Sequence, residues 1–206
     1  MTNLHPRYIA SHVYRYHPRA HTVELFLDYN CPFSGKLFKK MIEEVIPVLE
    51  KEGKHNFVFI NVIQPWHAFQ SGVLHEVSFA VARVAPGWFW EFSKKMFENI
   101  TEFYDTEVSQ FTRDELIEKV LKVASEGDED ESILNIDSIK SLVAISNTDR
   151  PSNPGSGVAV DTKYFTRYAR TIGVHVTPTI SVNGIVISEI DSSTESARII
   201  EILQNV

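Results

Sequence analysis

The chain contains a single cysteine, Cys31, among its 206 residues. One cysteine excludes an internal disulfide framework, and it leaves too few thiolates for a cysteine-based zinc site. Such scarcity is typical of proteins from reducing compartments. Any thiol chemistry of this protein must therefore centre on Cys31 and take a second thiol from another molecule.

Long apolar runs and clustered positive charge are also missing. No segment approaches the roughly 18 apolar residues that a membrane span requires, and the N-terminus has no apolar signal-peptide core. The 20 Lys and Arg residues are scattered among 27 Asp and Glu residues, and the net charge is -7. Without a long apolar segment, we expect no membrane as a partner. Without a basic stripe to neutralise successive phosphates, we expect no nucleic acid as a partner.

The first 23 residues contain Arg7, Arg15 and Arg19 but no acid, a bias shared by mitochondrial presequences. Within this segment the tyrosines and the valine of Ser11–Tyr16 alternate as in a short strand. We favour the strand, and so expect a cytoplasmic protein, with a mitochondrial location as the alternative. Four histidines nearby follow no common ligand spacing, so no metal site is predicted.

Residues 23–63 are predicted to form a strand, a helix and a second strand. Val23–Asp28 suits a buried strand, and Asn56–Ile63 is a continuous apolar run typical of a central strand. Apolar side chains recur at helical spacing between them, namely Leu37, Phe38, Met41, Ile42, Val45 and Leu49. Pro47 is expected to kink or end this helix. Such a βαβ unit forms a parallel strand pair with a right-handed crossover.

The middle of the chain is predicted to be helical. Helices are expected at Gly72–Val84, at an aromatic segment from Phe89, after a Thr112–Glu115 capping box, and at Ile133–Ile145. The acidic residues Gly127–Glu131 are predicted to form a solvated turn, and Asn147–Gly157 an exposed loop. These ninety or so residues indicate a helical insertion without a sheet of its own.

The last fifty residues return to an alternating pattern. An apolar helix face ends at Gly173, and Val174–Val182 is predicted to be a strand interrupted by Pro178. Asn183–Gly184 is a strong signal for a two-residue hairpin. Ser192–Glu195 is expected to cap the final helix.

This order of elements, with the motifs Cys31-Pro32-Phe33-Ser34 and Val176-Thr177-Pro178-Thr179, resembles the thioredoxin superfamily and its DsbA-like branch. The resemblance implies an α/β, thioredoxin-like fold with βαβ and ββα halves, a mixed sheet and an all-helical insertion. It implies a single domain over residues 1–206, with a core of about 8–66 and 158–206 and an insertion of about 67–157.

The physical chemistry of the first motif favours a reactive sulfur. Cys31 is predicted to open a helix, where unpaired backbone N–H groups and the helix dipole favour a thiolate over a thiol. Pro32 suits the first helical turn because it sacrifices no needed N–H group. The hydroxyl of Ser34 is expected to donate a hydrogen bond to the thiolate. We predict Cys31 and Ser34 as the catalytic pair.

The second motif is predicted to bind substrate beside the sulfur. A proline inside a strand-like run is tolerated only at an edge or a special bend, which makes Pro178 informative. The resemblance implies a cis peptide at Thr177–Pro178, with backbone groups of Thr177 holding an extended peptide. Pro32, Phe33 and Trp66 complete the predicted substrate-binding residues.

Two features depart from the family pattern. Ser34 replaces the second cysteine, which would otherwise attack the mixed disulfide and release the product. Leu25 stands six residues before the nucleophile, where thioredoxins carry a buried acid that assists proton transfer. Asp28 is closer in sequence, but its place at the end of a strand predicts a carboxylate that faces solvent.

The favoured function is a monothiol thiol-disulfide oxidoreductase. Cys31 would form mixed disulfides with a protein or small-molecule partner, and an external thiol such as glutathione would resolve them. A second hypothesis is a kappa-class-like glutathione transferase, in which the site stabilises the thiolate of glutathione. A third is a non-catalytic peptide-binding protein or redox sensor. No tightly bound cofactor is expected, and the sequence specifies no oligomeric state.

Overall fold

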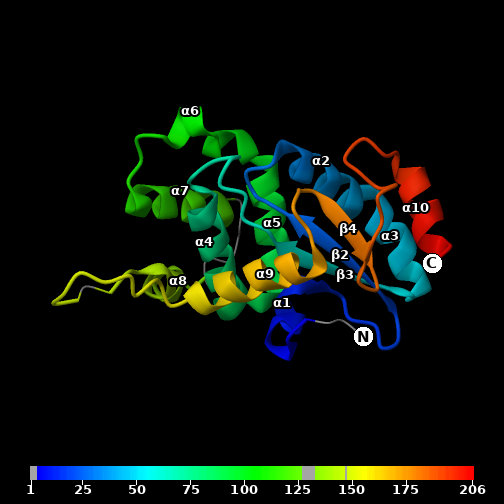
Figure 1. The fold of residues 1–206 in the computed structure, drawn as a ribbon, viewed down its shortest axis with the longest axis horizontal. Coiled ribbons are helices and arrows are strands. Elements are labelled where there is room, and N and C mark those ends of the chain that lie inside the picture. The colour runs from blue at the N-terminus through cyan, green and yellow to red at the C-terminus, as the bar shows by residue number, and fades with distance from the viewer. Residues whose placement is uncertain (1–3, 127–132, 147) are drawn as a thin grey trace.

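The computed structural model describes residues 4–126, 133–146 and 148–206. Its strands form one five-stranded sheet in the order β1-β3-β2-β4-β5 (Figure 1). Their bounds are β1 (Val13–Tyr14), β2 (His21–Leu27), β3 (His55–Asn61), β4 (Thr179–Val182) and β5 (Ile185–Val186). β2 and β3 run parallel, and the other pairs are antiparallel. The predicted mixed sheet of a thioredoxin-like α/β fold is confirmed.

The βαβ unit begins the sheet. The connection between β2 and β3 contains α2 (Pro32–Lys40), a π-helical turn (Met41–Val45), α3 (Ile46–Leu49) and a short 3₁₀ helix (Glu50–Glu52). Pro47 lies near the start of α3, directly after the π-helical turn, so regular α-helical geometry is interrupted where Pro47 was expected to kink or end the helix. Proline lacks the N–H that would bond four residues back, and the wider π turn just before it absorbs the mismatch.

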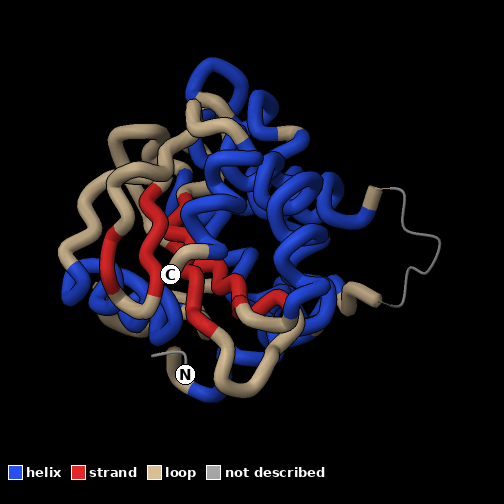
Figure 2. The backbone as a smooth tube through the Cα atoms, turned by 90° about the vertical axis from the view of Figure 1, so that its right-hand side faces the viewer, coloured by secondary structure: helices blue, strands red, loops and turns tan. Residues whose placement is uncertain are grey.

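The segment between β3 and the return to the sheet is helical. It contains α4 (Ser71–Val84), η4 (Pro86–Trp88), α5 (Phe89–Glu98), η5 (Ile100–Phe103), α6 (Asp105–Val108), α7 (Arg113–Ser125) and α8 (Ile136–Val143). Thr112 and Glu115 form the predicted capping box of α7. Helix α8 is shorter than predicted, and the acidic turn expected at Gly127–Glu131 lies outside the described residues. Figure 2 shows helices on both sides of the strands, with the larger group on one side.

The return half supplies α9 (Ala159–Ile172), the β4–β5 hairpin and α10 (Ser196–Gln204). Asn183 and Gly184 have φ angles of 53° and 84°, the left-handed pair that a tight hairpin turn requires. The predicted Ser192–Glu195 capping box is wrong, because the N-cap Glu195 has no side-chain hydrogen bond. Instead, the carboxylate of Asp191 accepts hydrogen bonds from the backbone of the preceding turn.

The N-terminal segment packs against both the sheet and the helices of the middle segment. It forms η1 (Pro6–Tyr8), α1 (Ile9–His12) and then β1, so the strand expected over Ser11–Tyr16 is reduced to two residues. His12 is the last residue of α1, and its buried ring lies with its centroid 4.2 Å from that of Phe89 and 4.7 Å from that of Phe165. Among the described residues, no helix has both the length and the apolar character of a membrane span.

Candidate active site

Cys31 is the N-cap of α2 and lies at the end of the short loop that follows β2. Its sulfur accepts a hydrogen bond from the backbone N–H of Ser34, with an N–Sγ distance of 3.4 Å. Its thiol donates to the carbonyl oxygen of Thr177, 3.3 Å away. The side chain is fully buried, so a partner molecule reaches the sulfur only when neighbouring side chains shift.

Strand pairing brings the two motifs together. β4 runs antiparallel to β2, with Phe26 opposite Thr179, so the loop before β4 lies beside the loop after β2. The Thr177–Pro178 peptide in that loop is cis. The two segments that the sequence analysis singled out thus meet at the sulfur of Cys31.

The hydroxyl of Ser34 has a different role from the one expected. It accepts a hydrogen bond from the backbone N–H of Asp28 at 3.3 Å, and the contact with the sulfur comes from the Ser34 backbone. The side chain is completely buried between the loop and the helix. Ser34 therefore ties the start of α2 to the end of β2, and the helix backbone supplies the hydrogen bond to Cys31.

Three of the predicted substrate-binding side chains, Pro32, Phe33 and Trp66, are exposed, and Trp66 and Pro32 line separate hollows. Trp66, 68% exposed, lines a cavity of about 330 Å³ with Arg170 and His175, which we call the tryptophan groove. Gln64 in its wall donates to the carbonyl of His175 at 3.0 Å, next to the segment that leads to Thr177. Phe33 is 60% exposed beside the sulfur-bearing turn.

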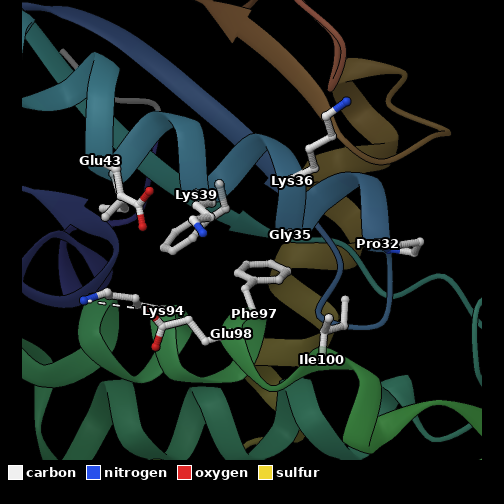
Figure 3. A pocket seen from close by; sticks show the side chains of 11 residues that line it. Pro32, Gly35, Lys36, Lys39, Glu43, Lys94, Phe97, Glu98 and Ile100 are labelled. Atoms are coloured by element: carbon white, nitrogen blue, oxygen red, sulfur yellow. Dashed lines mark ion pairs between the residues drawn. The ribbon is translucent and has the colours of Figure 1, made fainter.

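Pro32 borders the second hollow, a cavity of about 320 Å³ between α2 and α5. Figure 3 shows Pro32 and Ile100 at one end, with the ring of Phe97 facing Gly35. A β-carbon at Gly35 would lie 3.3 Å from that ring, so the glycine permits the close approach of the two helices. This cavity opens on the side of α2 that faces the helical segment.

Asp28 is buried, and the expectation that it faces solvent is wrong. Helix α4 and the loop before it cover the end of β2 and aim donors at its carboxylate. Oδ1 accepts from Ser71 Oγ at 2.6 Å, from the Asn30 backbone N–H at 3.1 Å and from His75 Nε2 at 3.2 Å. Oδ2 accepts from His67 Nδ1 at 2.9 Å and from the Gln64 backbone N–H at 3.1 Å. Asp28 therefore joins the cysteine loop, the Trp66 loop and α4.

The hydrogen-bond network beyond Asp28 fixes the tautomer of His75. Ser78 donates its hydroxyl proton to the His75 carbonyl, so its oxygen accepts from the amide of Asn61. The same amide then donates to His75 Nδ1 at 2.8 Å. The ring proton of His75 must therefore lie on Nε2 and point at Asp28. On the other side, Asn61 accepts from His12 Nε2 at 3.1 Å.

Burial and hydrogen bonding have opposite effects on the pKa values of Asp28 and His12. Burial raises the pKa of Asp28, but hydrogen bonds from His75, Ser71 and His67 outweigh it, and the net pKa lies below its usual range. Burial lowers the pKa of His12 to about 3, against a smaller opposing effect of its bond to Asn61. Asp28 is thus ionised and His12 is neutral at neutral pH.

Asp28 is the main site residue whose role the sequence analysis missed. The available signal was Asp-x-Asn directly after a strand, where an aspartate commonly accepts from the backbone N–H two residues on. A second buried acid, Glu24, lies within β2 and accepts from Ser181 Oγ at 2.5 Å and from Tyr168. Within the described part of the chain, no group of three or more His, Cys, Asp or Glu side chains is arranged to hold a metal ion.

The mixed sheet, the Cys-x-x-Ser turn at the start of α2 and the Thr177–Pro178 loop beside it define a thioredoxin-like protein with the helical insertion of the DsbA-like fold. A family model described as Thioredoxin matches residues 17–202, and the chain belongs to that family. The search of curated proteins found no match.

Solved structures share the fold at low identity. A candidate protein-disulfide isomerase from Pseudomonas syringae is 21% identical, with a TM-score of 0.73 over 95% of this chain and 99% of that one. Oxidised BdbD from Bacillus subtilis is 22% identical, with a TM-score of 0.63 over 95% and 92%. The thiol-disulfide exchange protein alpha-DsbA2 from Wolbachia pipientis is 16% identical, with a TM-score of 0.61 over 96% and 87%.

Proposed function

We propose that the protein is a monothiol thiol-disulfide oxidoreductase in which Cys31 is the nucleophile. The observation that carries this proposal is the position of its sulfur between the Ser34 backbone N–H at 3.4 Å and the Thr177 carbonyl at 3.3 Å. The N–H group lies at the start of a nine-residue helix, where backbone donors stabilise negative charge. The carbonyl belongs to the loop that would hold the substrate.

The proposed exchange consumes one disulfide and forms another. The thiol of Cys31 loses its proton, and the thiolate attacks one sulfur of a substrate disulfide. A new Sγ–S bond forms, the substrate S–S bond breaks, and the departing thiolate takes up a proton. No net electrons are gained or lost in this step.

Loss of the thiol proton also prepares the neighbouring loop. The carbonyl of Thr177 then has no S–H group to accept from, and it is left free for a backbone N–H of the incoming peptide. The exposed side chains of Phe33 and Trp66 offer apolar contacts to that peptide. The proposed substrate-binding residues are thus Thr177 through its carbonyl, Phe33 and Trp66 through their exposed rings, and Pro178 and Pro32 as their neighbours in the two motifs.

Release of the product is proposed to require a second thiol from solution. Cys31 is the chain's single cysteine, so no internal thiol can attack the mixed disulfide. Glutathione is the proposed co-substrate, because its thiolate can attack the mixed disulfide, leaving either Cys31 or the substrate bonded to glutathione.

Intact mass measurement after incubation with oxidised glutathione tests the proposal. The wild-type protein should gain one glutathione adduct that a reductant removes, and Cys31→Ala should gain none. An unmodified wild-type protein under these conditions would contradict the proposal. Conjugation of glutathione to 1-chloro-2,4-dinitrobenzene by Cys31→Ala would instead favour the transferase hypothesis.

A further inference from the structure

Although Lys and Arg are scattered along the sequence, helix α9 brings three of them onto one exposed face, which we call the α9 crest. Lys163, Arg167 and Arg170 are separated by four and three residues, so they share one face of the helix. All three are exposed, and none has a side-chain hydrogen bond or ion pair within the described residues. Like charges at this spacing destabilise a helix. These three cations lie together on one helix face although the chain has a net charge of -7.

The acid of α9 does not neutralise this crest. Asp161 is buried, accepts from Arg83 at 2.5 Å and lies 3.2 Å from a nitrogen of Arg7. Its charge is therefore already matched beneath the helix. By contrast, Arg198 on α10 is paired with Glu201 at 2.8 Å. The cations of the α9 crest remain available to a partner.

A groove lies along each flank of the crest. The tyrosine groove, about 370 Å³, is lined by Arg7, Lys163, Arg167 and the rings of Tyr164 and Tyr168. On the other flank, Arg170 lines the tryptophan groove beside the exposed ring of Trp66. No acid occurs among the described residues that line either groove. Both grooves thus combine cations with aromatic surface.

The crest is joined through the loop after α9 to Thr177, whose carbonyl lies beside the reactive sulfur. Figure 1 shows a loop that joins the end of α9 to β4, and this loop passes through His175 to Thr177. Gln64 ties the tryptophan groove to this turn through the His175 carbonyl. A chain held at Thr177 can therefore continue over the groove and onto the crest.

We propose that the α9 crest and its two grooves bind an acidic stretch of the polypeptide whose cysteine reacts at Cys31. This proposal rests on the proposed function. From Lys163 to Arg170 the crest is about 10 Å long at 1.5 Å per residue, which about three extended residues would span. A short acidic segment fits better than nucleic acid, because the negative charge of the remaining surface repels a long polyanion.

Binding of labelled peptides in which serine replaces the cysteine tests this interaction apart from the chemistry. Fluorescence anisotropy would compare a peptide with three Glu residues beside the serine with its Gln counterpart. The charge-reversed variant is Arg167→Glu with Arg170→Glu. Its matched control is Lys51→Glu with Lys122→Glu, which changes the net charge equally at two exposed lysines away from α9.

The wild-type protein and the control should bind the Glu peptide at least tenfold more tightly than the Gln peptide at low salt, and the preference should shrink at 0.5 M salt. The charge-reversed variant should lose the preference. Equal binding of both peptides, or an equal loss in the control, would overturn the proposal. So would binding of anionic vesicles without binding of the Glu peptide. Failure of Cys31 to exchange disulfides while the Glu peptide still binds would overturn the proposed function alone.

Discussion

The sulfur of Cys31 lies 3.3 Å from the carbonyl oxygen of Thr177, although 146 positions separate the two residues in the chain. Pairing of β2 with β4 creates this contact, because the loops that extend the two strands meet at the same end of the sheet. The contact joins the proposed nucleophile to the proposed peptide-binding loop.

Replacing Ser34 by cysteine should restore the internal release step. The new thiol would occupy the resolving position of a C-x-x-C motif, three residues after Cys31 and buried beside it. A mixed disulfide of Ser34→Cys should break down without added thiol, leaving an intramolecular disulfide detectable by mass. Ser34→Ala is the control and should keep the dependence on added thiol. A stable mixed disulfide in Ser34→Cys would show that geometry, and not the missing thiol, prevents release.

Asp28→Asn should destabilise the fold by about 3 kcal/mol. Three donors face one carboxylate oxygen and two face the other, so an amide NH₂ group in either orientation meets donors it cannot bond. Urea denaturation measures the loss. Asp137→Asn, at an exposed aspartate in the first turn of α8, serves as the control. An unfolding free energy equal to that of the wild type would contradict the role assigned to Asp28.

The sequence predicted those structural features that depend on residues close together in the chain, and it missed those that depend on residues far apart. Helix and strand patterns within residues 23–63 reflect local periodicity, and they predicted the parallel pair correctly. The environment of Asp28 depends instead on Ser71 and His75, which a helix more than forty residues away places over the end of β2. Sequence patterns also misled at Ser192–Glu195, where the predicted capping box does not form. The carboxylate of Asp191 accepts hydrogen bonds from the backbone N–H groups of this turn instead.

Acid should destabilise the protein partly through His12. Its pKa is lowered from 6.5 to about 3 in the fold, so the unfolded chain binds a proton that the folded chain excludes. This contribution to stability is complete above pH 6.5 and is lost as the pH falls toward 3, by about 1.4 kcal/mol per pH unit. Asp28, with its lowered pKa, loses its own contribution only below pH 3.8.

Urea denaturation at pH 7, 6, 5 and 4.5 measures this dependence. His12→Gln should be less stable at pH 7, because a buried ring is lost, but its stability should fall less steeply below pH 6.5. The difference in slope isolates His12 from His55, whose pKa burial also lowers. Parallel curves for the two proteins would show that His12 does not titrate as described.

Truncation of Trp66 should weaken peptide binding without affecting stability. The ring is 68% exposed, so its loss leaves no cavity in the core. Exposed aromatic anchors commonly contribute 1 to 2 kcal/mol to an interface, which corresponds to a roughly tenfold rise in Kd for Trp66→Ala. Phe111→Ala, at an exposed ring before α7, is the matched control. Unchanged affinity in Trp66→Ala would remove the tryptophan groove from the binding surface.

The most direct test of the monothiol mechanism is the rate at which a purified mixed disulfide of the wild-type protein releases its peptide. Because the chain has no second cysteine, this rate should rise linearly with glutathione concentration and extrapolate to zero without glutathione. A release rate that does not depend on glutathione concentration would contradict resolution by an external thiol.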